Sequence, residues 1–138
     1  MEHNRRTIME KNEKVSVNMN IGTLSQIDLL VDKGFYSNRS DFINQAVREA
    51  LNNKQDRIND EKEKHSSMNF IWFLGLYTLN AMELMDIKKR GNTKKISGYG
   101  VLYIDERLDE LVFETINEID VKGKILCSDN VKKHYGLK

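Results

Sequence analysis

The chain has 138 residues, 39% hydrophobic and 31% charged, a balance typical of a globular protein rather than a disordered or fibrous one. Its one cysteine excludes an internal disulfide and favours a reducing, intracellular setting. A net charge of +1 argues against a polycationic nucleic-acid coat but is compatible with a focused DNA-binding face. No apolar run follows the charged N-terminal residues, so we expect no signal peptide.

The first predicted elements are a flexible polar arm over residues 1–13 and a β-strand over residues 14–20. The strand sequence, KVSVNMN, alternates strictly between polar and apolar residues. Successive side chains of a strand point to opposite faces. One face would therefore be apolar and the other polar: Val15, Val17 and Met19 against Lys14, Ser16 and Asn18. Asn20 would either extend the polar face or cap the turn into the next helix.

Two helices are predicted after the strand. Apolar residues at helical spacing mark the first over residues 23–33, and Gly34 is a plausible stop. The second starts near Asn38, a favourable N-cap, and Asp41 can close a capping box or favour the positive end of the helix. Its apolar face is wide: Phe42, Ile43, Ala46, Val47, Ala50 and Leu51.

A polar stretch over residues 52–65 separates this region from the rest of the chain. It is typical of an exposed helical extension or a linker, so we place the domain boundary there. The first domain then covers residues 14–58, and residues 59–65 are the linker or helix extension.

Residues 66–138 are predicted to form a second domain for oligomerisation or effector binding. Residues 66–90 are apolar around most of a helical circumference, which predicts one long helix buried in its own domain or against a second subunit. A membrane span is disfavoured because Glu83 and several polar residues interrupt the run. The remaining elements are a loop over 90–100, a strand over 101–104, a helix over 105–119, a strand over 123–127 and a helical turn over 128–135. The predicted fold class is α+β, with a small C-terminal α/β domain led by the long apolar helix.

The 14–58 segment is too small to close a core alone, because it has one strand and two helices. Its strand also needs a partner for its edge N–H and C=O groups. A twofold-related copy supplies both needs, through an antiparallel two-stranded ribbon over four helices. Such a ribbon fits the major groove of DNA.

In residues 14–58 the sequence resembles the ribbon-helix-helix family of DNA-binding proteins, of CopG, Arc and MetJ type. The matching segments are KVSVNMN, TLSQIDLLVDKG and, most specifically, the helix entry GFYSNRSDFINQAVREAL. The resemblance covers about a third of the chain and does not extend to residues 66–138.

The resemblance implies two sets of DNA contacts. Lys14, Ser16 and Asn18 match the outward ribbon positions that contact base edges, and Lys, Ser and Asn side chains all have suitable donors. Asn38, Arg39 and Ser40 match the start of the second helix, which binds a phosphate. From the residues alone, Arg5, Arg6 and Lys11 of the arm could add salt-sensitive phosphate contacts. The alternative for the ribbon positions is an ordinary solvent-facing edge strand, and for Arg39 an ordinary exposed residue.

Other chemistry has weak support. His3, His65, Cys127 and His134 lie far apart without metal-ligand spacing, so we expect no metal site and no cofactor. The acidic residues that follow position 104 suit a helix N-terminus, and glycine-loop and nucleophile motifs are missing from the sequence, so we expect no enzyme. The aromatic residues of 68–87 could line a small-molecule pocket, although a subunit core is the favoured alternative.

The leading hypothesis is a sequence-specific transcriptional regulator that binds double-stranded DNA as a homodimer, in the cytoplasm and associated with the nucleoid. One alternative is an antitoxin or protein-interaction module, and another is a low-specificity chromatin organiser. The operator, the regulated genes, any ligand, any oligomer beyond the dimer and the choice between repressor and activator stay open at this stage.

Overall fold

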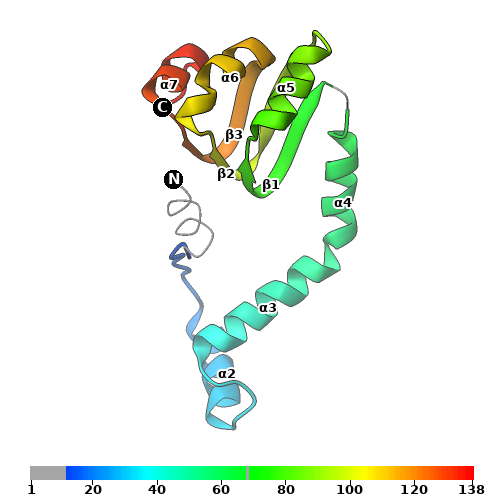
Figure 1. The fold of residues 1–138 in the computed structure, drawn as a ribbon. Helices are drawn as coiled ribbons and strands as arrows, with labels where there is room; N and C mark the ends of the chain where they lie inside the picture. Colours follow the sequence, from blue (N-terminus) through cyan, green and yellow to red (C-terminus); the bar gives the residue numbers. More distant parts are fainter. Residues whose placement is uncertain (1–11, 68) are drawn as a thin grey trace. The chain divides into compact units, whose positions relative to one another are not determined.

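The computed structural model describes residues 12–67 and 69–138 (Figure 1). Contacts within the chain divide it into two compact units. The N-terminal unit extends to Asp60, and the C-terminal unit begins at Glu61.

Three helices make up the N-terminal region: α2 (Ile21–Asp32), α3 (Arg39–Asn53) and α4 (Gln55–Lys64). The first two confirm the predicted helices, with α2 beginning two residues early. It begins there because the Asn20 side chain accepts a hydrogen bond from the Gly22 N–H at 2.8 Å and so acts as the N-cap. Most of the polar stretch after α3 forms the further helix α4. Of the two predicted alternatives, a helical extension or a linker, the structure therefore shows the helical extension.

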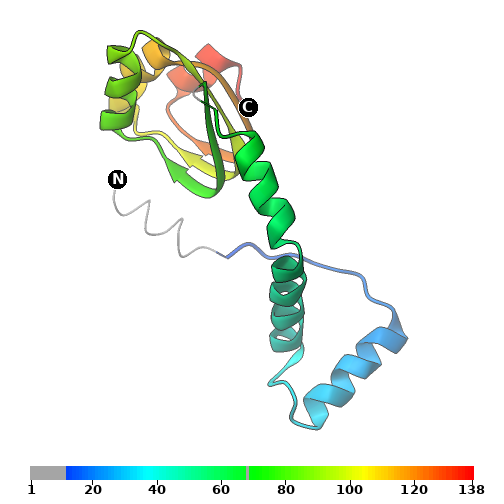
Figure 2. The same ribbon diagram turned by 90° about the vertical axis from the view of Figure 1, so that its right-hand side faces the viewer.

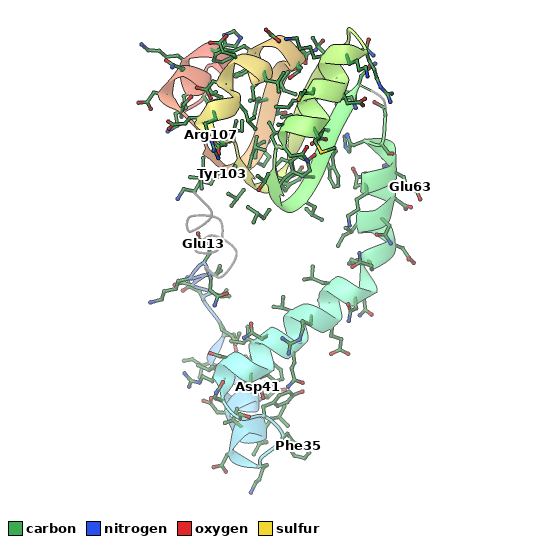
Figure 3. All side chains as sticks on the ribbon, viewed as in Figure 1. Glu13, Phe35, Asp41, Glu63, Tyr103 and Arg107 are labelled. Carbon is green, nitrogen blue, oxygen red and sulfur yellow. The ribbon has the colours of Figure 1, made fainter. Side chains whose placement is uncertain are left out.

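The entry into α3 is held by local hydrogen bonds. Asn38 Oδ1 accepts from the Asp41 N–H at 2.8 Å, as an N-cap should. The Asp41 carboxylate accepts in return from the Ser37 N–H at 3.0 Å, one residue before the position that a standard capping box uses. These bonds lower the pKa of Asp41 below its usual range, the Ser37 bond first and a Gln45 bond second. Figure 3 marks Asp41 at this turn.

The structure does not contain the predicted strand as a regular element. Residues 12–20 have no assigned secondary structure, and the chain's sheet does not include them. A β-ladder needs a second strand, and the predicted second strand belongs to another copy of the chain. The α+β class holds, but the antiparallel ribbon remains a proposal.

The C-terminal unit alternates strands and helices around a parallel sheet (Figure 1). The sheet has the strand order β1-β2-β3, with both neighbouring pairs parallel. Its elements are β1 (Phe70–Thr78), α5 (Ala81–Lys89), β2 (Lys94–Tyr103), the 3₁₀ turn η1 (Glu106–Leu108), α6 (Asp109–Thr115), β3 (Ile116–Leu126) and α7 (Asp129–Tyr135).

The long helix predicted over 66–90 is therefore wrong. Its first half is β1, and only Ala81–Lys89 is helical, beginning after the N-cap Asn80. The strand β1 is apolar on both faces, with Ile71 and Phe73 buried on one face and Phe70 and Leu74 partly exposed on the other, so its sequence lacks alternation and resembles a buried helix. The β-branched and aromatic residues in FIWFLGLYT were the signal that favoured a strand.

Two further boundaries differ from the prediction. The glycine-containing stretch 90–100, predicted as a loop, supplies most of β2, so the strand predicted over 101–104 is only its end. The helix predicted over 105–119 ends at Thr115, and β3 begins at Ile116 instead of residue 123. The last helix, α7, is confirmed, with Ser128 Oγ capping the Val131 N–H at 3.2 Å.

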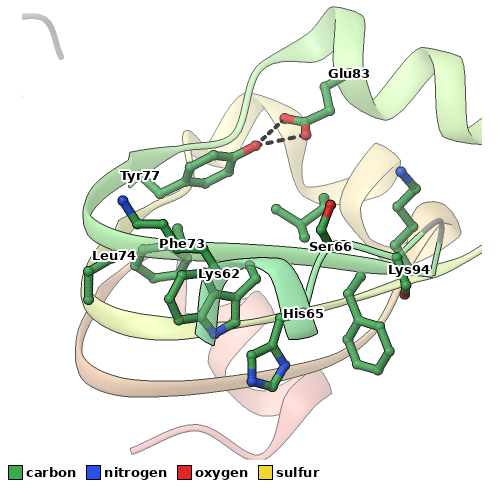
Figure 4. Close-up of a pocket in the computed structure, with 12 residues that line it drawn as sticks. Lys62, His65, Ser66, Phe73, Leu74, Tyr77, Glu83 and Lys94 are labelled. Atoms are coloured by element: carbon green, nitrogen blue, oxygen red, sulfur yellow. Dashed lines mark hydrogen bonds between the residues drawn. The ribbon is translucent and has the colours of Figure 1, made fainter. Parts of the chain in front are cut away.

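A row of glycines crosses the sheet and explains how glycine occurs inside its strands. Gly75, Gly100 and Gly123 are register partners, with φ values of +99°, +127° and +145°. A side chain is disfavoured in this conformation, and a Cβ on Gly100 would lie 2.0 Å from the Gly75 carbonyl oxygen. The strands curve strongly along their length, as Figures 2 and 4 show.

The hydrophobic core belongs to the C-terminal unit. Helices α5, α6 and α7 pack against the strands, and each contributes a buried aliphatic side chain. The buried cluster consists of Ile71, Phe73, Leu79, Leu84, Ile87, Ile96, Leu102, Ile104, Val112, Ile116, Ile119 and Val131. In the described part of the N-terminal unit, by contrast, Ile27 is the one buried hydrophobic residue.

Tyr135 ties α7 to the junction of α6 and β3. Its hydroxyl lies 2.7 Å from the Ile116 carbonyl oxygen and 3.0 Å from that of Val112, and partial burial raises the pKa of Tyr135 to about 12.

We expect Tyr135→Phe to lower the free energy of unfolding by about 1–3 kcal/mol, because the carbonyls lose their donor. Denaturant unfolding would measure this loss. The control is Tyr99→Phe at an exposed position on β2, and an equal loss in both variants would contradict the assignment.

No helix in the described ranges 12–67 and 69–138 combines the length and apolar character needed to cross a membrane.

Candidate nucleic-acid interface

The proposed base-contacting residues lie in the extended segment before α2. Lys14, Ser16 and Asn18 are all exposed. The apolar residues between them are exposed too: Val15 by 79% and Val17 by 73%. Both faces of the segment are thus exposed to solvent in the single chain. An exposed apolar face of this kind is typical of a surface that binds another chain.

The uncovered apolar surface continues over the helices. Ile21, Leu29, Phe35, Ile43, Val47 and Leu51 are exposed large hydrophobic residues of the N-terminal unit. Phe35, which Figure 3 labels, is 72% exposed in the turn between α2 and α3. Ile43, Val47 and Leu51 belong to the apolar face predicted for the second helix, so most of that face is free of intrachain cover, whereas Ile27 of α2 is buried and Phe42 is half-buried.

The second predicted set, Asn38, Arg39 and Ser40, lies at the start of α3. The first backbone N–H groups of a helix lack intrahelical acceptors, and with the helix dipole they favour an anion. Asn38 has a structural role here, because its side chain caps the helix. Ser40 is exposed in the first turn.

Arg39 has a partner that the sequence did not indicate. Its Nε and Nη2 donate to the two carboxylate oxygens of Asp28 on α2, at 2.7 and 2.9 Å. These hydrogen bonds lower the pKa of Asp28 and raise that of Arg39. The pair joins two helices across a turn, so no short-range spacing could reveal it. A bidentate carboxylate occupies two of the five guanidinium donors, which leaves three for another acceptor.

The arm residues Arg5, Arg6 and Lys11 lie outside the described residues. The predicted contacts of the arm are therefore still predictions.

The model of the ribbon-helix-helix transcriptional regulator family matches residues 10–132. The chain belongs to this family. None of the curated proteins and none of the solved structures gives a significant match.

Membership in the ribbon-helix-helix family makes the chain a transcriptional regulator of this type, a class generally without enzymatic activity. The match is longer than the 14–58 resemblance. It extends through β1, β2 and β3 and into α7, so the C-terminal unit is part of the family's pattern.

The acidic residues that follow β2 have local structural partners. Asp105 caps η1 and forms an ion pair with Arg107 at 2.7 Å, and Asp109 accepts from Ser128 Oγ at 2.5 Å. Figure 3 labels Arg107. Among the described residues, no group of three or more His, Cys, Asp or Glu side chains is placed to hold a metal ion.

The C-terminal unit has a cavity of about 470 Å³ along β1 (Figure 4). The Tyr77 hydroxyl donates to the Glu83 carboxylate, with both oxygens at 2.7 Å. Burial and this hydrogen bond raise the pKa of Tyr77. Trp72 stacks on His65, with ring centroids 5.5 Å apart. The aromatic residues of the 68–87 stretch therefore line a cavity, although they come from a strand.

Proposed function

We propose that this ribbon-helix-helix regulator binds specific double-stranded DNA sequences as a homodimer, with a two-stranded ribbon in the major groove. The observation that carries the proposal is the extended segment before α2, in which exposed apolar and polar residues alternate. Pairing with a second copy would bury Val15, Val17 and Met19 over the exposed apolar faces of α2 and α3.

The opposite face of this ribbon would carry Lys14, Ser16 and Asn18 twice. Asn can bind adenine N6 and N7 in a bidentate way, Lys can donate to guanine O6 and N7, and Ser can pair with several bases. The start of α3 would bind a backbone phosphate and position the ribbon. We place this activity in the cytoplasm, at the nucleoid.

Selection of bound duplexes from a random pool, followed by sequencing, tests the proposal. A homodimer predicts a symmetric enriched motif, because twofold protein symmetry is matched by a palindromic site. Enrichment without any motif would favour a chromatin organiser of low specificity. Absence of enrichment would favour the protein-interaction alternative.

The Asp28–Arg39 pair gives a prediction about salt dependence. If Arg39 contacts a phosphate, Arg39→Ala will weaken binding to all duplexes similarly. It will also lower the slope of log affinity against log salt by about 1.8, since about 0.9 is expected per lost contact and a dimer loses two. Asp28→Asn should act in the opposite direction, because it removes a negative charge that competes with the phosphate.

Fluorescence anisotropy with a random duplex over a salt series would measure these changes. Asp32→Asn is the matched control, because it removes the same charge one helical turn further along α2. Arg39→Ala with an unchanged slope would show that the ion pair has only a structural role.

A further inference from the structure

The two edges of the sheet differ in charge. Within the described residues, β1 and β3 are its edge strands, and each pairs only with β2. The edge strand β3 has four charged residues, Glu118, Asp120, Lys122 and Lys124. Glu118 also forms an ion pair with Lys95 of the neighbouring strand β2 at 3.4 Å. The nine residues of β1, FIWFLGLYT, contain no charge at all.

This difference matters because an edge strand exposes unpaired backbone N–H and C=O groups. Proteins usually protect such edges with charged side chains, especially lysine, with proline or with a very short strand. The β3 edge has this protection and the β1 edge does not. A long, uncharged edge is suited to pairing with another strand.

Side chains along β1 are also incompletely covered. Phe70 is 39% exposed and Leu74 is 48% exposed. The cavity beside them also reaches inward-facing residues, among them Phe73 and Tyr77 (Figure 4). At Gly75 a Cβ would meet nothing within 4 Å, whereas at Gly100 and Gly123 it would meet the preceding strand. On this side, β2 has β1 as its neighbour and β3 has β2, but the corresponding space beside β1 is open.

We propose that β1 pairs antiparallel with β1 of a second copy of this chain, which joins two three-stranded sheets into one of six strands. A twofold contact brings the same surface together from both copies. An uncharged strand can pair with itself in this way without like-charge repulsion.

Three charged side chains line the cavity, Lys62, Glu83 and Lys94, and the two that lie at opposite ends of β1 favour this occupant. Lys94 lies where β1 begins, since the backbone N–H of its neighbour Lys95 donates to the Asn69 carbonyl oxygen. Glu83 lies in the first turn of α5, beyond the end of β1. Antiparallel pairing brings the beginning of one β1 to the end of the other. Lys94 of each copy would therefore lie toward Glu83 of the other copy.

The β1 contact goes beyond the proposed function, because it requires neither DNA nor the ribbon. The test uses the full chain in reducing buffer, with Val15→Asp and Val17→Asp introduced together. Both residues are more than 70% exposed in the single chain, so these changes oppose ribbon pairing without disturbing intrachain packing. Sedimentation over a range of protein concentrations then reports the remaining self-association.

We expect this ribbon-deficient chain to remain dimeric at micromolar concentration. Adding Leu74→Lys should weaken the remaining association on the order of 100-fold, because two like charges meet near the twofold axis. The control adds Tyr99→Lys instead, which places the same charge at an exposed position on the central strand β2 and should leave the dimer intact.

Hydrogen exchange provides a second measurement that does not depend on the stability of the lysine variant. Backbone amides of β1 in the ribbon-deficient chain should become more protected as the protein concentration rises, and those of β3 should not.

A ribbon-deficient chain that is monomeric at every concentration would overturn the proposal. Loss of the dimer with Tyr99→Lys but not with Leu74→Lys would also overturn it, since the contact would then use the sheet face. Because no DNA is present, these results are separate from any failure of the DNA-binding proposal.

Discussion

Asn18→Ala should reduce the preference of the protein for its selected DNA site over random duplex by at least roughly 30-fold. A bidentate contact from asparagine to a base contributes about 1–3 kcal/mol of discrimination, and the homodimer would lose two such contacts. Ser16→Ala should have a smaller effect, because a hydroxyl makes a less selective contact. Affinity for random duplex should change little in both variants, since it depends mainly on phosphate contacts.

Competition binding with the selected site and a random duplex measures this ratio. Asn59→Ala is the matched control, because it makes the same substitution at an exposed position on α4. An unchanged ratio in Asn18→Ala and Ser16→Ala would show that the ribbon is not the base-contacting element. An equal loss of affinity for both duplexes would instead assign these residues to phosphate contacts or to folding.

Gly100→Ala should have the largest effect on the stability of the C-terminal unit. The new Cβ would lie 2.0 Å from the Gly75 carbonyl oxygen and 2.8 Å from its carbonyl carbon, which are backbone atoms that cannot rotate away. Adding the strain of a positive φ to this overlap, we expect a loss of roughly 3–5 kcal/mol in the free energy of unfolding. Gly123→Ala should behave similarly, because its Cβ would meet the Gly100 carbonyl oxygen.

Gly91→Ala separates the two causes of this loss. Gly91 also has a positive φ, +69°, but a Cβ there would meet nothing within 4 Å. We therefore expect a loss of only about 1–2 kcal/mol, from backbone conformation alone. Denaturant unfolding followed by tryptophan fluorescence is suitable, since Trp72 is the one tryptophan and lies on β1. Similar losses in Gly100→Ala and Gly91→Ala would show that the sheet adapts to the new methyl group.

The N-terminal helices were predictable because their signals are local. Asn38 followed by Asp41 marks a helix start whatever lies around it, and the structure shows the cap hydrogen bond there. The apolar stripe of α3 likewise has helical spacing within one segment. The Asp28–Arg39 pair was not predictable, because it depends on how the turn orients two helices.

The C-terminal unit was harder to predict because its apolar runs have no distinctive period. FIWFLGLYT is apolar at positions on both faces of the strand, although Phe70 and Leu74 are partly exposed, so it suits a buried helix as well as a strand, and only its β-favouring residues argued for a strand. The glycines of residues 90–100 suggested a loop. Gly98 and Gly100 instead lie within β2, and Gly100 belongs to the glycine row that allows three strands to approach closely while they curve.

The sequence by itself determined the helix–turn–helix order of the N-terminal unit, its caps, its family and the alternation that predicts the ribbon, because each depends on residues close together in the chain. Only the tertiary structure decided that β1 is a strand, that three glycines form one row, that Asp28 binds Arg39, and that one edge of the sheet is uncharged while the other is not. These features depend on which segments become neighbours. The burial of the whole hydrophobic core determines which segments pack together, and no short stretch of sequence contains that information.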